Sequence, residues 1–273
     1  MRLICQRLRA VAFCATSLAL TVAAGANVIV LDPTKDTTLF ENNPSNNLGG
    51  EDLAVGATAQ GKRMRPLFFF DVAGAVPSGA TIDAVSLIFF VTRNPYLGLI
   101  PSTVGLHEAL VDWTEGTGND ASGNNGVAAL PGESTWNSRA HGSVAWGVAG
   151  GQAGVDYVAV ASGTGAMNAP GEYTIPSTAA LVADVQSWLD NPAGNFGYFM
   201  ISANEATAGN GRRFASTENL DQLQSPVPVA TPRLQITYTV PEPGSSALLG
   251  VSGLLALCGR GRGVSSRKQT PSI

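Results

Sequence analysis

The chain has 273 residues, of which 13% are charged and 44% are hydrophobic, and its formal net charge is −4. This composition excludes a coiled coil, which is rich in charged helix-forming residues, and it excludes a disordered polyelectrolyte. The 32 Gly and 16 Pro residues follow no three-residue period, so a collagen is excluded as well, and many turns between short strands are favoured.

The first 26 residues predict an export signal. A basic start is followed by an apolar run from Ala10 to Val22; the basic residues are Arg2, Arg7 and Arg9. Ala24 and Ala26 fit an Ala-x-Ala site for signal peptidase, with cleavage before Asn27. An uncleaved membrane anchor is the weaker alternative, because about 13 apolar residues fall short of the roughly 20 that a spanning helix needs. The rest of the chain is therefore expected to leave the cytoplasm.

The central part of the chain is acidic and contains no cysteine. From Asn27 to Glu242, nine basic residues stand against 20 acidic ones, a net charge of −11, while the other seven basic residues lie before and after this range. This charge repels nucleic acid and anionic lipid, so we expect neither as a partner. Cys5 and Cys14 belong to the signal and Cys258 to the C-terminal segment, which leaves no disulfide, thiolate metal site or cysteine nucleophile in the centre.

Strand patterns dominate the centre, with Gly, Asn and Pro between them. The predicted strands are Asn27–Leu31, Thr37–Glu41, Asp52–Gly56, Leu67–Phe70, Ala84–Val91, Thr103–Val111, Tyr157–Ala161, Phe196–Ala203, Arg212–Ser216 and Arg233–Val240. In Leu67–Phe70 and Ala84–Val91 both the odd and the even positions are mostly apolar, so both faces of each strand are apolar. This predicts central strands that are covered on both faces. The pattern favours an all-β, jelly-roll-like antiparallel sandwich.

Two segments interrupt the strands. Residues 116–154, called the long loop below, are rich in Gly and Asn and carry Trp136 and Trp146, which makes disorder a poor explanation for them. A single short covering helix is predicted between an N-cap in Pro176–Thr178 and a stop at Asn191-Pro192. Its apolar residues recur on one face and are Leu181, Val185, Trp188 and Leu189.

The C-terminal segment combines a short motif, an apolar run and a basic cluster. Val240-Pro241-Glu242-Pro243 is followed by uncharged residues from Gly244 to Cys258 and then by Arg260, Arg262, Arg267 and Lys268. As a helix the uncharged run would reach roughly 22 Å, less than the roughly 30 Å of the hydrocarbon core. The basic residues that follow keep the C-terminal end of the segment on the cytoplasmic side of the membrane. The segment is therefore expected to be a short hydrophobic helix that inserts into the membrane only temporarily.

These C-terminal residues resemble the PEP-CTERM sorting signal. The resemblance implies recognition by an exosortase, a membrane-embedded transpeptidase-like enzyme of Gram-negative bacteria, and it makes Val240, Pro241, Glu242, Pro243, Arg260 and Arg262 the sorting residues. Signal peptidase and exosortase are then the expected partners during export. The implied location is the cell envelope, the outer surface or the extracellular matrix.

The centre is similar to a DNRLRE domain. The residues that carry this resemblance, in order, are Asp36–Thr38 with the Asn-rich turn to Gly49, Arg65–Asp71, Val76–Ile82, Asp112–Gly116, Thr135–Asn137, Trp146-Gly147, Asp184–Trp188, Asn195–Gly197, Arg213–Glu218 and Pro232–Leu234. It implies a jelly-roll sandwich of exported proteins, with some relatives classed as carbohydrate-binding modules, and it implies no catalysis. The expected organisation is a signal peptide over 1–26, this domain over 27–239, the sorting signal over 240–263 and a disordered tail over 264–273.

No catalytic residue, metal ligand or cofactor is predicted. His107 and His141 are isolated, no Gly-x-Ser-x-Gly elbow is present, and two histidines cannot build a zinc motif. Calcium is a weaker alternative, because oxygen-bearing residues gather around one turn without an Asp-x-Asp-x-Asp-Gly loop. Those residues are Asp32, Asp36, Asn42, Asn43 and Asp52.

Ligand binding is favoured over catalysis. Trp113, Trp136 and Trp146 lie at or in the long loop, where indole rings could stack on a sugar, although packing of the loop is the competing role. Arg63, Arg65, Arg212 and Arg213 would form a cationic spot if their strands pair, or else neutralise nearby acids.

The sequence thus predicts an exported, non-enzymatic module that binds extracellular polysaccharide or has a structural role. The alternative is an envelope-located polysaccharide hydrolase or lyase that uses carboxylates near Trp113, among them Asp112 and Glu115.

Overall fold

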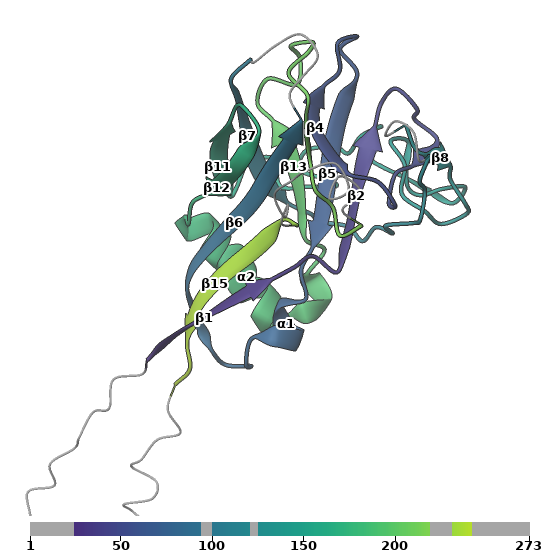
Figure 1. Ribbon diagram of the computed structural model, residues 1–273. Coiled ribbons are helices and arrows are strands. Elements are labelled where there is room, and N and C mark those ends of the chain that lie inside the picture. The colour runs from purple at the N-terminus through teal and green to yellow at the C-terminus, as the bar shows by residue number, and fades with distance from the viewer. Residues whose placement is uncertain (1–24, 94–99, 121–124, 219–230, 242–273) are drawn as a thin grey trace, which may run out of the picture.

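The computed structural model describes residues 25–93, 100–120, 125–218 and 231–241, and these are almost entirely strands and turns (Figure 1). The strands are β1 (Ala26–Leu31), β2 (Lys35–Phe40), β3 (Asn46–Asn47), β4 (Leu53–Ala57), β5 (Arg63–Phe69), β6 (Thr81–Arg93), β7 (Ser102–Glu108), β8 (Val127–Ala128), β9 (Ser138–Ala140), β10 (Val144–Ala145), β11 (Gly163–Met167), β12 (Gly171–Ile175), β13 (Tyr198–Ser202), β14 (Arg212–Phe214) and β15 (Arg233–Thr239). The helical elements are α1 (Val72–Ala75), α2 (Ala179–Asp190) and the 3₁₀ turn η1 (Pro192–Gly194).

One curled antiparallel sheet makes up the body. Its strands run in the order β1-β15-β6-β14-β4-β5-β13-β7-β11, with β12 paired to β6 and β2 paired to β5. The curl brings the two halves of the sheet face to face, and their inward side chains form the main hydrophobic core. The predicted all-β antiparallel sandwich is confirmed.

Strand alternation decides which side chains enter this core. On β6, Val85, Leu87 and Phe89 are buried, whereas Ser86 and Ile88 on the other face are only half-buried. The prediction that Ala84–Val91 is covered on both faces is therefore correct for one face only. On β5 it is correct for both, because Phe68 packs in the main core and Leu67, on the opposite face, packs in a second one.

The second core lies on the outer face of β5 and β13. Leu39, Leu67 and Phe199 project outward from their strands and are covered by side chains from residues 109–157. The covering residues are Ala109, Trp113, Trp136, Trp146 and Tyr157. The described residues of the long loop, with the short strands β8, β9 and β10, thus form a layer on the sheet, at the right of Figure 1.

Most predicted strands are present within a few residues of their expected bounds, but one is absent, and six observed strands were not predicted: β3, β8, β9, β10, β11 and β12. Tyr157–Ala161 forms no strand; Tyr157 makes only isolated bridges with Ala109 and Ala153. Strand β11 was missed because Gly163–Met167 consists of small residues and one terminal Met and so lacks an apolar alternation. Strands β3, β8, β9 and β10 are only two or three residues long, too short for an alternation to show.

The single predicted helix is α2, and the short α1 and η1 are additional elements that were not predicted. The Thr178 hydroxyl accepts a hydrogen bond from the Leu181 amide at 3.1 Å, as an N-cap does, and Asn191 is the C-cap. The four residues expected on its apolar face are all buried, and the helix packs against β6. Among the residues that the structure describes, no helix has both the length and the apolar character needed to cross a membrane.

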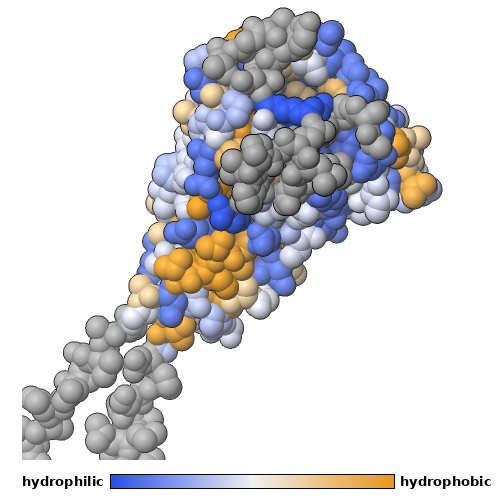
Figure 2. Space-filling view, in the orientation of Figure 1, coloured by the Kyte–Doolittle hydropathy of each residue, from blue (hydrophilic) through white to orange (hydrophobic). Residues whose placement is uncertain are grey.

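Both ends of the body leave from one pole. β1 pairs with β15 along its whole length, so that Ala26 lies opposite Thr239, and in Figure 1 the outer ends of the two strands lie side by side at the lower left. An apolar patch covers β1 beside these exits (Figure 2), where Val28 is 61% and Val30 49% exposed. The predicted signal helix, C-terminal helix and tail, with Ala24, Glu242, Pro243, Arg260 and Arg262, lie outside the described residues.

Candidate functional site

The three tryptophans expected to bind sugar are buried. Trp113, Trp136 and Trp146 are 2–4% exposed. The indole N–H of Trp113 donates to the Phe196 carbonyl at 2.9 Å, and that of Trp146 to the Thr135 carbonyl at 2.8 Å. These contacts support the competing role, in which the indoles pack the long loop onto the sheet, and they leave no open aromatic face for a sugar.

Arg63 and Arg65 lie on the long-loop side of β5. Their guanidinium carbons sit 4.9 and 5.6 Å from the ring centre of Trp136. Arg63 pairs with both carboxylate oxygens of Glu41, and Arg65 pairs with both of Glu205 while also donating to two carbonyls of the long loop. Both residues thus neutralise acids, and Arg65 fastens the loop to the sheet.

Arg212 and Arg213 lie apart from that pair, because β4 separates β14 from β5. Arg212 is buried, and its guanidinium donates to the carbonyls of Ile100, Asn168 and Asn210 at 2.6–2.9 Å. Arg213 is half-buried on the same short strand. The structure therefore does not unite the four arginines into one cationic spot.

Arg212 and Arg213 do share a pocket of about 570 Å³. The pocket lies among β2, β4, β14 and the β4–β5 turn, and this volume is in the range of ligand sites in proteins. Its apolar lining includes Phe40, Leu48 and Met64, and its polar lining includes Asn42, Gln60, Arg93 and Asn125. Met64 faces the pocket while its neighbours Arg63 and Arg65 face the long loop, as strand alternation requires.

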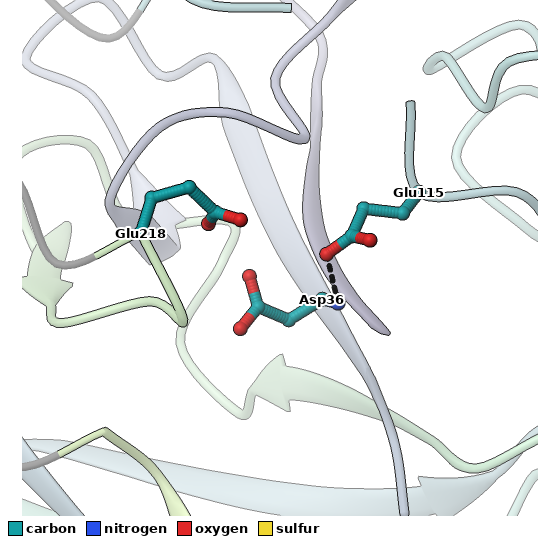
Figure 3. Close-up of side chains that lie close together, drawn as sticks. All are labelled: Asp36, Glu115 and Glu218. Atoms are coloured by element: carbon teal, nitrogen blue, oxygen red, sulfur yellow. Dashed lines mark hydrogen bonds between the residues drawn. The ribbon is translucent and has the colours of Figure 1, made fainter. Parts of the chain in front are cut away.

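A second candidate site consists of three carboxylates. Asp36 on β2, Glu115 before the long loop and Glu218 after β14 bring ligand oxygens within 4.8 Å of one another (Figure 3). Asp36 is fully buried, Glu115 is half-buried and Glu218 is exposed. The site therefore opens to solvent on the Glu218 side.

Two backbone amides and one hydroxyl hold these carboxylates in place. The amide of Asp36 donates to Glu115 Oε1 at 2.7 Å, and the amide of Thr217 donates to Asp36 Oδ2 at 2.9 Å. The Thr217 hydroxyl donates to Glu218 Oε1 at 3.0 Å. Each carboxylate thus has one oxygen fixed by a hydrogen bond.

Burial acts against the charged form of Asp36 and of Glu115. Burial, reinforced by the charges of Glu218 and Glu115, raises the pKa of Asp36 to about 8. Burial also raises the pKa of Glu115, although Lys35 opposes this rise. Lys35 itself donates to Asp112 and to the Trp113 carbonyl.

Of the residues considered for calcium, Asp36 is the one that joins this group. Asp32 accepts a hydrogen bond from Thr231, Asn43 donates to Asn125, and Asn42 lines the pocket. Sequence reasoning noted Glu115 for its position near Trp113 but missed Glu218. No local signal connects these residues, because the contact depends on the packing of three distant segments.

The histidines act as packing or loop residues. His107 is half-buried, with its ring against Tyr157 and its Nδ1 hydrogen-bonded to the Val158 carbonyl at 2.9 Å. Burial lowers the pKa of His107. The backbone of His141 bonds to Gly132 and Glu133 within the long loop.

Comparison with protein families matches residues 239–262 to the PEP-CTERM protein-sorting motif. The match starts on the last residue of β15, where the folded body ends. No curated protein matches the chain at a significant level. The chain therefore carries a signal for export and cell-envelope sorting by an exosortase-type system.

Proposed function

We propose that the chain is a non-enzymatic envelope or matrix protein of a Gram-negative bacterium, held transiently in the inner membrane by its C-terminal helix before sorting. The observation that carries this proposal is the sorting motif at residues 239–262, which begins where β15 ends. Because Ala26 pairs with Thr239, the end that follows the predicted signal-peptidase site lies beside the start of the sorting signal. Both processing enzymes would then act at one pole of the body.

The sorting part is tested by deletion in a host that has an exosortase. A chain lacking residues 240–263 should be exported yet neither shortened by the exosortase nor delivered to its normal location. A chain lacking only residues 264–273 is the matched control and should be processed normally. Mass spectrometry of the purified protein and cell fractionation give both readouts, and normal sorting of the first deletion would contradict the proposal.

The body, with its resemblance to the DNRLRE domain, is proposed to bind a neutral or weakly charged glycan or else to have a structural role. The pocket on β2, β4 and β14 supports binding, because apolar side chains stand beside amides and a guanidinium, as the faces and hydroxyls of a sugar require. The glycan contacts first expected of the tryptophans are assigned to this pocket instead, since the indoles are buried.

Glycan binding is tested with the full chain on a glycan array and by titration of any glycan that is retained. Gln60→Ala and Arg213→Ala should each weaken binding about tenfold, a loss of about 1.4 kcal/mol. Arg233→Ala is the control, because Arg233 lies on β15 and pairs with Glu172 away from the pocket. Absence of binding to every glycan would remove this role and leave the structural one.

The hydrolase or lyase alternative draws on the carboxylates near Trp113. The oxygens of Asp36, Glu115 and Glu218 lie within 4.8 Å of one another, closer than the roughly 5–5.5 Å between the carboxyl groups of retaining glycosidases. Asp36 is also fully buried, so a glycosidic oxygen has no access to it. Polysaccharide turnover that survives purification and disappears in Glu115→Gln would contradict the non-enzymatic proposal.

A further inference from the structure

The three-carboxylate group contains a buried oxygen without a partner. Asp36 Oδ1 is inaccessible to solvent and makes no hydrogen bond, whereas Oδ2 accepts from the Thr217 amide. A buried polar atom in a folded protein is nearly always satisfied, so an orphan of this kind needs an explanation. In Figure 3 the Asp36 carboxylate points toward Glu218, on the open side of the group.

Glu115 and Glu218 resemble Asp36 in that only one oxygen of each carboxylate is hydrogen-bonded. Glu115 Oε1 and Glu218 Oε1 are hydrogen-bonded, while their second oxygens make no hydrogen bond within the described residues. Three segments therefore present three oriented carboxylates, each with one oxygen engaged and one unengaged. Hydrogen bonds that fix a carboxylate in this way are the usual support of metal ligands.

The distances suit a single ion. A cation with metal–oxygen distances of about 2.4 Å can contact oxygens that lie up to about 4.8 Å apart on opposite sides of it. The ligand oxygens of Asp36, Glu115 and Glu218 fall within that span. We propose that Asp36, Glu115 and Glu218 form a binding site for one calcium ion, with water completing the coordination on the exposed side of Glu218.

Calcium fits this donor set better than other common ions. All three ligands are hard carboxylate oxygens, and Ca²⁺ tolerates irregular coordination by strand and loop residues. Mg²⁺ demands a near-ideal octahedron, while zinc sites favour nitrogen and sulfur ligands. The site lies on the same face of β2 as the pocket residue Thr38, but it shares no residue with the pocket, so it does not depend on glycan binding.

The ion would fasten the sandwich at a point where three segments meet. Glu115 belongs to the layer that covers the outer face, and Glu218 follows β14, so a bound ion joins both segments to β2. We therefore expect calcium to stabilise the fold and not only to occupy a surface site.

The test is titration of the chelator-treated, full chain with CaCl₂ by calorimetry and by thermal unfolding. One ion should bind per chain, and at a hundredfold excess over the dissociation constant the melting temperature should rise by roughly 5 °C or more. Asp36→Asn, Glu115→Gln and Glu218→Gln should each weaken calcium binding at least about tenfold. Glu218→Gln is the decisive variant, because its side chain is exposed and its loss does not threaten folding.

Asp83→Asn is the matched control, since Asp83 is an exposed acid on β6 outside the group, and it should bind calcium as the unmodified chain does. The absence of calcium binding, or binding that all three variants leave unchanged, would overturn the site. A rise in melting temperature with MgCl₂ equal to that with CaCl₂ would overturn the assignment to calcium.

Discussion

Arg65 connects the sheet to the layer that covers it. Its side chain is 7% exposed, and it bonds to both oxygens of Glu205 and to the carbonyls of Gly150 and Gly151. Arg63, two residues earlier, also lies against Trp136, but its side chain is 37% exposed and its partner Glu41 is partly exposed. The two arginines thus have the same charge and the same aromatic neighbour but differ in burial.

We expect Arg65→Ala to lower the free energy of unfolding by about 3 kcal/mol, because Glu205 and two buried carbonyls would lose their donor. Arg63→Ala should cost less than about 1 kcal/mol, as is usual for partly exposed ion pairs. Urea denaturation measures both values. Equal losses for the two variants would contradict the role given to Arg65.

The candidate sites show what sequence can predict for single residues. The sequence indicates that the tryptophans in and beside the glycine-rich loop are important. Whether they pack or bind depends on the residues beneath them, here Leu67 and Phe199, which the sequence does not reveal. The meeting of Asp36 with Glu115 and Glu218 was not predictable. It arises from contacts across the whole chain, and each residue alone is one of 20 acids.

Among the elements, α2 meets the sheet through two half-buried acids, Asp184 and Glu108. The hydroxyl of Tyr198 on β13 donates to Asp184 at 3.0 Å, and the indole N–H of Trp188 donates to Glu108 on β7 at 3.0 Å. Burial raises the pKa of Asp184, and burial together with the charge of Asp184 raises the pKa of Glu108. The helix therefore packs best when these groups keep their protons.

This arrangement predicts a pH dependence of stability. Between the ordinary carboxyl pKa and the raised pKa of the folded state, the unfolded chain binds fewer protons, so the free energy of unfolding falls as pH rises and levels off above the raised pKa. Asp184→Asn should reduce the slope, since it removes one titrating group and one like charge beside Glu108. Chemical denaturation from about pH 4 to about pH 7 measures the slope, and an unchanged slope would be evidence against this origin.

Local signals explain which elements were predictable. The helix α2 has an N-cap, an apolar face and a proline stop within 17 residues (176–192), and β15 alternates Leu234 and Ile236 with polar neighbours. Strand β11 lacks such a signal for a structural reason. A Cβ on Gly163 would lie 2.6 Å from Leu181 Cδ1, so the approach of α2 leaves no room there for the large side chains that identify a strand.

For the molecule as a whole, the integrity of the sheet depends on β15. It is hydrogen-bonded to β6 on one side and to β1 on the other, and Leu234 and Ile236 are fully buried in the main core. The last strand that the structure describes is therefore an interior strand, and its partners β1 and β6 lie far from it in the sequence.

Truncation tests this dependence. A chain that ends after Pro241 should unfold cooperatively at nearly the same temperature as the full chain, because it keeps β15 and loses only residues 242–273, which follow that strand. A chain that ends after Pro232 lacks β15 and should show no cooperative transition, since β1 and β6 would lose their shared partner. Circular dichroism during heating distinguishes the two, and a cooperative transition in the shorter chain would refute the assignment.

The pairing of β1 with β15 also determines how the protein resists a mechanical load. If the C-terminal end is attached to the cell and a polymer pulls on the opposite pole, tension runs lengthwise through β15. Its hydrogen bonds to both neighbours lie across that direction, so they must shear together and cannot open one by one. An attachment through the N-terminal end would load β1, which is held on one side only, and would be the weaker tether.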